Sequence, residues 1–343
     1  MRPSVNQGID PFGERSARPH HRSLQLLGAR FRFESNSSRL LQLVDQAFAG
    51  LPRHRLAATT PPLLVRLQLT ARRQRTSSAP PPPLNTCAGA GLLCGAIDAS
   101  NLVVISPGQR SALVVVSRDL LRHPYHVRYE LIEFAVYVLA ARALRLVPLH
   151  AAAVGRRGRG LLLMGDSGAG KSTLALHCLL QGLDILSEDA VFVAPDGRSA
   201  TGVASFLHLQ RGGLRFLRGH SAARRIRRSP IIRRRSGAEK YEVDLRRSGY
   251  RLAPAPLTIH ALVLLSKRRA SDDRLLVPVA ARGLAARLAA YQPYAAGQQG
   301  WRRFVGSLAG VRAVELRRGS HPAAAVAALR TLLDLPKRSA PRA

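Results

Sequence analysis

The stretch LLLMGDSGAGKSTLALHCLLQGLDILSEDAVFV, residues 161–193, decides the fold of this chain. An apolar run, GLLLM at 160–164, comes before a glycine-rich loop, and leucines at helical spacing follow the loop as far as Gly182. A strand, a glycine loop and a helix in this order are the context that a phosphate-binding loop requires. The stretch therefore predicts an α/β domain that binds a nucleotide.

The loop matches the pattern G-x-x-x-x-G-K-[ST] and has one further glycine inside it. Glycines let successive backbone N–H groups point at phosphate oxygens, and the positive end of the following helix adds to the attraction. Lys171 is expected to reach the β- and γ-phosphates, and Ser172 is expected to ligate Mg²⁺. The predicted nucleotide-binding residues are Gly165, Asp166, Ser167, Gly168, Ala169, Gly170, Lys171, Ser172 and Thr173.

Two acidic residues, Glu188 and Asp189, interrupt the apolar segments that follow this helix. A buried carboxylate is costly unless it is paired or holds a metal. In an ordinary P-loop ATPase or GTPase the metal-binding acid lies much further from the loop, whereas Asp189 comes only 18 residues after Lys171. The pair thus indicates a different kind of P-loop protein, although a structural pair neutralised by nearby arginines stays open.

Three segments, LHAAAV at 149–154, GDSGAGKS at 165–172 and SEDAVFV at 187–193, resemble HPr kinase/phosphorylase and the wider group of HPr-kinase-like proteins. The resemblance covers residues 148–195, with a looser similarity to about residue 280. It implies an α/β fold with a P-loop kinase domain of the HPr kinase C-terminal type, and the pattern of elements before residue 150 predicts a small α+β N-terminal region ahead of this domain. The family normally has two aspartates where this chain has Glu188 and Asp189.

The resemblance also implies an activity, the transfer of the γ-phosphate of ATP to a Ser or Thr hydroxyl of a protein or peptide. It implies ATP and Mg²⁺ as cofactors and places His150, Lys171, Ser172 and the two acids around the γ-phosphate. We assign catalytic roles to Glu188, Asp189 and His150, with Glu188 as the base and Asp189 joining Ser172 at the metal, although the sequence cannot order the two acids. Three alternatives stay open: dephosphorylation of a phosphoprotein, a nucleotide-binding regulator that has lost catalysis, and a basic nucleic-acid binder.

The charge of the chain is high, with a formal net charge of +33 and a sequence pI near 11.8. The four lysines are Lys171, Lys240, Lys267 and Lys337, and the other 49 cationic residues are arginines distributed along the whole length. This composition indicates a general preference for arginine, so charge by itself does not support nucleic-acid binding. It also makes each lysine worth inspecting.

Three cysteines without a C-x-x-C pair predict neither a disulfide framework nor a zinc site. The most apolar long segment, residues 131–149, carries charged residues that make a membrane span too costly. We therefore expect a cytoplasmic protein with no membrane contact, and homo-oligomerisation stays open.

Four regions are predicted along the chain: a disordered tail at 1–23, the small α+β region at 24–149, the nucleotide-binding domain at 150–336 and a short tail at 337–343. The N-terminal region is expected to contain a strand and helix at 31–51, a hairpin at 101–117 and a long helix at 125–145, with a loop over 72–86. A last helix is expected at 322–335. The arginine-dense stretch 224–244 is expected to be a mobile surface loop.

Overall fold

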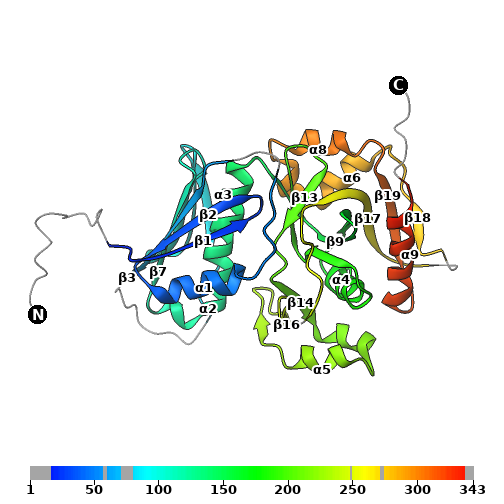
Figure 1. Ribbon diagram of the computed structural model, residues 1–343, viewed down its shortest axis with the longest axis horizontal. Coiled ribbons are helices and arrows are strands. Elements are labelled where there is room, and N and C mark those ends of the chain that lie inside the picture. Colours follow the sequence, from blue (N-terminus) through cyan, green and yellow to red (C-terminus); the bar gives the residue numbers. More distant parts are fainter. Residues whose placement is uncertain (1–16, 57–59, 71–79, 248, 271–273, 337–343) are drawn as a thin grey trace, which may run out of the picture. The chain divides into compact units, whose positions relative to one another are not determined.

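The computed structural model describes residues 17–56, 60–70, 80–247, 249–270 and 274–336. The chain divides into two compact units, coloured from blue to red along the sequence in Figure 1. The first contains the residues up to Leu24, Arg30–Ala49 and Pro62–Leu139, and the second contains Gln25–Ala29, Gly50–Pro61 and the residues from Ala140 onward. The boundary at residue 150 stays a prediction.

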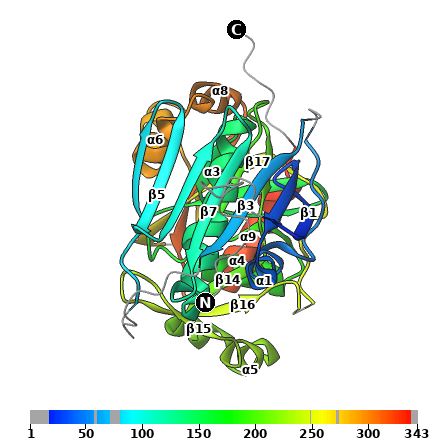
Figure 2. The same ribbon diagram turned by 90° about the vertical axis from the view of Figure 1, so that its left-hand side faces the viewer.

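A seven-stranded sheet forms most of the first unit, and Figure 2 shows strands β5, β7, β3 and β1 in that order across it. Its strands are β1 (His20–Leu26), β2 (Ala29–Ser35), β3 (Leu63–Thr70), β4 (Asn85–Gly89), β5 (Leu92–Asp98), β6 (Asn101–Ser106) and β7 (Ser111–Ser117). The order is β1-β2-β3-β7-β6-β5-β4, with β2, β3 and β7 parallel and the hairpins β4–β5 and β6–β7 antiparallel. The hairpin predicted at 101–117 is confirmed.

Alternating apolar residues explain why one face of this sheet is buried. In β2 and β3 the buried side chains include Phe31, Phe33, Val65 and Leu67, at every second position. Helix α1 (Ser38–Phe48) lies in the connection between these two parallel strands, and its Phe48 ring stacks on Phe33 at 6.3 Å between centroids. The strand and helix predicted at 31–51 are therefore confirmed.

The long helix predicted at 125–145 is a continuous helical run with a change of winding. It comprises α2 (Pro124–His126), the π-helical segment η2 (Val127–Glu133) and α3 (Phe134–Ala143), after a 3-10 turn η1 (Leu120–Arg122). Two differences concern the other N-terminal predictions. Strand β1 begins at His20, so residues 20–23 belong to the sheet rather than to a tail. The loop predicted at 72–86 falls largely outside the described residues, and strand β4 begins at Asn85, near the end of that predicted loop.

A nine-stranded mixed sheet forms the centre of the second unit. Its strands are β8 (Val147–His150), β9 (Ala152–Arg156), β10 (Arg159–Met164), β11 (Asp184–Ser187), β12 (Ala190–Val193), β13 (Ser199–Gly202), β17 (Leu257–Arg269), β18 (Leu276–Pro278) and β19 (Arg312–Arg318). The order is β11-β9-β10-β17-β13-β12-β8, and β19 pairs with both β17 and β18. Strand β10 runs parallel to β17, and β17 runs parallel to β19.

Helices cover this sheet on both faces, which explains the uninterrupted apolar character of β10. Leu161 and Leu163 pack with α4 (Lys171–Leu180) and α9 (Pro322–Asp334), visible together in Figure 1. Leu162 and Met164 pack on the other face with residues of α6 (Leu284–Tyr291), α7 (Pro293–Ala296) and α8 (Trp301–Ser307). Strands buried on both faces are typical of α/β proteins.

The stretch predicted to be a mobile loop is folded, so that prediction was wrong. A three-stranded sheet is formed by β14 (Phe206–Gln210), β16 (Glu239–Asp244) and β15 (Ile231–Arg233), and the 3-10 helix η3 (Arg211–Leu217) and α5 (Ser221–Arg227) complete this part. Ile226, Ile232 and Val243 are buried and anchor these elements. The arginines occupy the exposed positions between the anchors.

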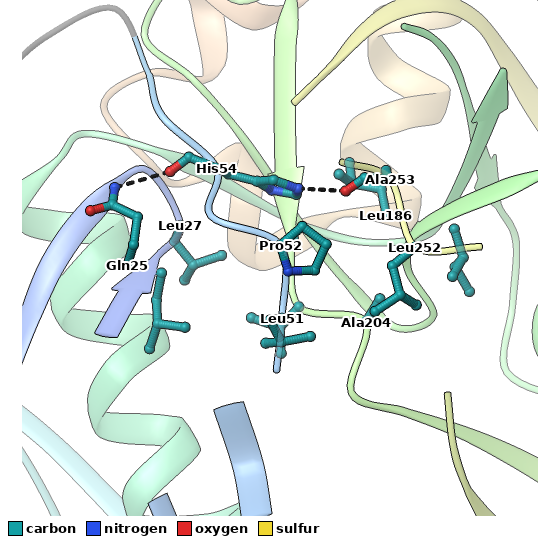
Figure 3. Close-up of a pocket in the computed structure, with 13 residues that line it drawn as sticks. Gln25, Leu27, Leu51, Pro52, His54, Leu186, Ala204, Leu252 and Ala253 are labelled. Carbon is teal, nitrogen blue, oxygen red and sulfur yellow. Dashed lines mark hydrogen bonds between the residues drawn. The ribbon is translucent and has the colours of Figure 1, made fainter. Parts of the chain in front are cut away.

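A pocket in the second unit is lined mainly by apolar side chains and backbone (Figure 3). Its one titratable lining residue, His54, is buried, and burial lowers its pKa. The neutral ring donates from Nε2 to the carbonyl of Ala253 (2.9 Å), so Nδ1 accepts from the Thr201 hydroxyl (2.8 Å). Because both nitrogens are engaged, the pocket offers little to a polar ligand, and His54 ties residues 50–56 to strand β13.

The three cysteines are free, as expected. Cys87 and Cys94 lie directly opposite each other in the β4–β5 hairpin, and Cys178 is buried in α4. Among the described residues, no helix is both long and apolar enough to cross a membrane.

Candidate functional site

The glycine-rich loop connects the end of β10 to the start of α4, as the sequence predicts. Gly170 directly precedes α4 with φ +101°, a conformation that only glycine adopts readily. A Cβ atom built at Gly168 or Gly170 would point into open space. The loop therefore has room for a ligand at the N-terminus of a ten-residue helix.

Lys171 is the first residue of α4, and its ammonium group turns back into the loop. Nζ donates to the carbonyl oxygens of Gly165 (2.7 Å) and Asp166 (3.2 Å). Burial lowers the pKa of Lys171, and three nearby carboxylates, that of Asp189 foremost, oppose this effect in part. The loop thus holds a mostly buried cation at the place where phosphate oxygens are expected.

The first acid of the pair is buried behind the loop. Glu188 accepts a hydrogen bond from the Ser172 hydroxyl through Oε1, and its Oε2 lies 3.3 Å from Nδ1 of His208 on β14. The other ring nitrogen of His208 lies 3.4 Å from Glu242 Oε1 on β16. Burial lowers the pKa of His208, but the hydrogen bonds to both glutamates outweigh burial and raise it. Ser172 and His208 thus contact different oxygens of the Glu188 carboxylate.

The second acid faces outward. Asp189 has a side chain that is 39% exposed, against 6% for Glu188. Its Oδ1 lies 3.1 Å from His150 Nδ1, and its Oδ2 lies 3.9 Å from Arg234 Nη2 at the end of β15. Partial burial raises the pKa of Asp189, but the hydrogen bond to His150 and the charges around it lower the pKa well below its usual range. Asp189 is therefore an accessible, fully ionised carboxylate.

The backbone of His150 is fixed by a residue from a distant part of the chain. The Gln292 side chain, which is buried, accepts from the His150 N–H (2.7 Å) and donates to the His150 carbonyl (3.0 Å). Strand β8 pairs His150 with Ala190 of β12, the residue after Asp189. Sheet pairing and Gln292 together set the position of the imidazole beside the carboxylate.

All the lysines in the described part of the chain gather around this loop. Lys267, at the end of β17, lies 3.7 Å from Asp166 Oδ2, and the charge of Lys240 on β16 acts on Lys171. In a chain with 49 arginines this clustering is selective. A lysine ammonium is a compact point charge, suited to single phosphate oxygens.

The structure thus brings together the predicted residues His150, Lys171, Ser172, Glu188 and Asp189. Sequence reasoning missed four polar neighbours that complete the site: His208, Arg234, Glu242 and Gln292. None of the four belongs to a local motif. Arg234 lies in the stretch that we expected to be a loop, and the isolated polar positions in apolar strand β14 were the one available signal for His208.

A comparison with curated proteins finds a relative that is similar to part of this chain. No family model matches the chain. A curated relative, HPr kinase/phosphorylase of Mycoplasmopsis pulmonis (strain UAB CTIP), is 38% identical over 72 residues, which is 21% of this chain and 23% of the relative. Over those 72 residues the chain is similar to HPr kinase/phosphorylase. The resemblance expected from the sequence is thereby confirmed.

A solved structure, the Hpr(Ser) kinase/phosphatase from Coxiella burnetii, is 13% identical in sequence to this chain, with a TM-score of 0.28. The superposed region covers 54% of this chain and 94% of the Coxiella burnetii chain. The matched part spans less than a quarter of the curated relative's length.

The residues of this site fit a nucleotide and its magnesium ion. The open space at Gly168 and Gly170 beside a buried ammonium group suits a polyphosphate. Ser172 and Glu188 present hard oxygen donors, which Mg²⁺ prefers. Within the described residues no group of three or more His, Cys, Asp or Glu is arranged to hold a metal alone. Magnesium in nucleotide sites needs only one or two carboxylates because phosphates and water complete its shell.

Proposed function

We propose that this chain is an ATP-dependent kinase that transfers the γ-phosphoryl group to a Ser or Thr hydroxyl of a protein or peptide. The observation that carries the proposal is that the two acids differ in burial and in hydrogen-bond partners. Glu188 is bonded to the loop serine, whereas Asp189 is exposed and oriented by His150. A hydrolase that only activates water needs no such open carboxylate beside the loop, but an enzyme with a large hydroxyl acceptor does.

Glu188 and Ser172 are the proposed holders of the metal, which reverses the order of roles that we assigned from the sequence. Glu188 already bonds the Ser172 hydroxyl, and its distance from solvent leaves no room for an acceptor. When bound with ATP, Mg²⁺ would neutralise charge on the phosphate oxygens. His208, 3.3 Å from Oε2, would orient the Glu188 carboxylate for that role.

Asp189 is the proposed acceptor of the hydroxyl proton. Its lowered pKa makes it a weak base, but phosphoryl transfer proceeds through a loose transition state in which orientation of the hydroxyl matters more than early proton removal. His150 holds the carboxylate from one side at 3.1 Å. Lys171, released from its loop carbonyls, would stabilise the charge that develops on the transferred group.

The experiment is incubation of the protein with γ-labelled ATP and Mg²⁺ together with a lysate or candidate peptides from the same cell. Lys171→Ala and Asp189→Asn are run beside the wild type. We expect labelled Ser or Thr with the wild type and at least a hundredfold less with either variant. Equal labelling by wild type and Lys171→Ala would show that the transfer does not come from this site.

A second candidate is removal of the phosphate from the product, because the curated relative is named a phosphorylase as well as a kinase. The same groups would act in reverse, with Asp189 returning the proton to the leaving serine oxygen. Incubation of the labelled product with the protein and orthophosphate, without ATP, measures this reaction. Loss of label that depends on Lys171 would assign both directions to the site.

A further inference from the structure

The folded part that replaces the expected loop, residues 205–247, is unusually basic, and we call it the arginine-rich lobe. It contains thirteen Lys or Arg and three Asp or Glu, a net charge of +10 in 43 residues. The remaining 300 residues together carry +23. The lobe therefore has about three times the charge density of the rest of an already basic chain.

This charge is displayed on ordered elements. Ten of the arginines are exposed, at positions 211, 215, 218, 224, 225, 227, 228, 233, 235 and 247. Helix α5 is held by buried Ala222, Ala223 and Ile226, so Arg224, Arg227 and Arg228 are fixed at its surface. Arginines whose backbone is held in a folded element lose less conformational freedom when they bind carboxylates than arginines on a mobile loop would.

The lobe adjoins the nucleotide loop and the proposed base. Strand β14 lies against α4, and these elements are seen together with β16 and α5 in Figure 1. A Cβ built at Gly213 of η3 would lie 3.3 Å from Thr173 Oγ1. The hairpin turn between β15 and β16, closed by the Arg234 N–H to the Ala238 carbonyl at 2.9 Å, sends Arg234 to Asp189. An acceptor bound on the lobe would thus have its hydroxyl near the site.

The two phenylalanines of the lobe are covered by its own arginines, and its one tyrosine, Tyr241, is partly buried against the core. Arg215 lies over the Phe216 ring at 4.6 Å, and Arg246 lies over the Phe206 ring at 5.0 Å. Single-stranded nucleic acids bind by stacking bases on uncovered aromatic rings as well as by charge. The lobe offers the charge without such platforms, which favours carboxylates over bases.

Resting on the proposed kinase function, we infer that the arginine-rich lobe docks an acidic segment of the acceptor, a peptide in which Asp or Glu residues flank the phosphorylated serine or threonine. Arginine forks match carboxylates in geometry, and a dense positive surface steers an acidic partner toward it. The partner class is therefore set by the lobe, whereas the chemistry is set by the loop and the two acids.

The test uses two fluorescein-labelled peptides, each with one serine, flanked by six glutamates in one and by six glutamines in the other. Binding to the full chain is measured by anisotropy without nucleotide. We expect the acidic peptide to bind at least tenfold more tightly. The variant Arg224→Gln/Arg227→Gln/Arg228→Gln should weaken its binding about tenfold.

A matched variant, Arg282→Gln/Arg302→Gln/Arg330→Gln, removes the same charge from exposed positions outside the lobe and should change binding less than twofold. Equal losses in the two triple variants would overturn the inference, because net charge alone would then explain binding. A single-stranded 15-mer DNA that binds the lobe more tightly than the acidic peptide would also overturn it and would assign the lobe to nucleic acid.

The transfer reaction separates this inference from the proposed function. Lys171→Ala should bind the acidic peptide like the wild type yet transfer no label to it. If the wild type phosphorylates both peptides equally well, the kinase proposal stands and the docking inference fails. If the acidic peptide binds through the lobe but no acceptor is ever labelled, the kinase proposal fails.

Discussion

Gln292 illustrates how a single buried amide can control a site from outside it. Its side chain forms two hydrogen bonds to the backbone of His150, the residue that orients Asp189. We expect Gln292→Ala to lower the free energy of unfolding by about 1–3 kcal/mol, because two buried backbone groups lose their partners. We expect kcat to fall more than KM rises, because the proposed base loses its orientation.

Gln292→Glu is the matched variant, since it keeps the acceptor for the His150 N–H but has no donor for the carbonyl when ionised. Steady-state kinetics and chemical unfolding of both variants check the prediction. A Gln292→Ala protein with wild-type kcat would show that His150 does not need this support.

His177 affects how the stability of the fold depends on pH rather than catalysis. The residue is buried in α4 against Phe216 and His321. Burial, helped by the charges of the neighbouring histidines, lowers the pKa of His177 from 6.5 to about 4. The unfolded chain therefore binds the proton first, and stability falls as the pH decreases from about 6.5 to about 4, by up to about 1.4 kcal/mol per pH unit.

The variant His177→Leu should remove this part of the pH dependence, whereas His21→Leu, at an exposed position, should leave it unchanged. Urea unfolding at several pH values, followed by the fluorescence of Trp301, measures the difference. The same acid-induced loss in His177→Leu and in the wild type would refute the assignment.

Individual residues differ in how far their roles can be read from the sequence. The glycine-rich loop between β10 and α4 was predictable because its residues are neighbours in the chain and each type has a physical reason to be there. His208 and Gln292 were not, because they reach the site from elements 20 and 142 positions away from their partners. The roles proposed for Glu188 and Asp189 rest on their different burial, which cannot be read from two adjacent positions in the sequence.

Gly155 of strand β9 has no room for a side chain, because atoms of the neighbouring strands β10 and β17 lie where its Cβ would be. A Cβ at Gly155 would lie 2.3 Å from the Arg159 carbonyl oxygen and 2.7 Å from Leu257 Cδ1. We expect Gly155→Ala to destabilise the second unit by about 1–3 kcal/mol or more, because the strands must separate to admit the atom. Thermal unfolding of the purified variant checks this expectation.

Gly306 provides the contrast within the same unit. It lies inside α8 with no atom within 4 Å of a built Cβ, so Gly306→Ala should stabilise the protein by about 0.5–1 kcal/mol through better helix propensity. The two variants should shift the unfolding temperature in opposite directions. Shifts of the same sign would contradict the packing at β9 and β10.

Elements with a clear apolar pattern were predicted well, and the arginine-rich lobe was not. Strands β6, β7 and β10 are short apolar runs next to turn residues, so the local sequence identifies them. In the lobe, α5 has seven residues and β15 has three, too few for a period to emerge among the arginines. Their order comes from isolated buried anchors such as Ile226 and Ile232, which a local pattern does not reveal.

The whole chain carries its single tryptophan, Trp301, in the second unit, beside Phe304 on α8. Its fluorescence therefore reports the unfolding of the unit that contains the nucleotide loop. A ligand that binds only the folded protein stabilises it by about 2.7 kcal/mol at a hundred times its Kd. We expect Mg-ATP at that ratio to raise the Trp301 unfolding midpoint by several degrees.

Lys171→Ala is the control, and its midpoint should not respond to the same Mg-ATP concentration. Omission of Mg²⁺ should reduce the shift in the wild type, because Ser172 and Glu188 are the proposed metal holders. A midpoint that rises equally in the wild type and in Lys171→Ala would place ATP elsewhere on the molecule.

The β4–β5 hairpin provides a site for selective labelling of the first unit. Burial raises the pKa of the Cys178 thiol to about 12, so this cysteine is inert to alkylation at neutral pH, while Cys87 is exposed and faces Cys94 across the ladder. Opposed residues of antiparallel strands lie about 5 Å apart, so a dye with two thiol-reactive groups can bridge the two cysteines. The natural chain therefore admits a site-selective optical label in one unit and has an intrinsic fluorophore in the other, and each can be observed without any engineered residue.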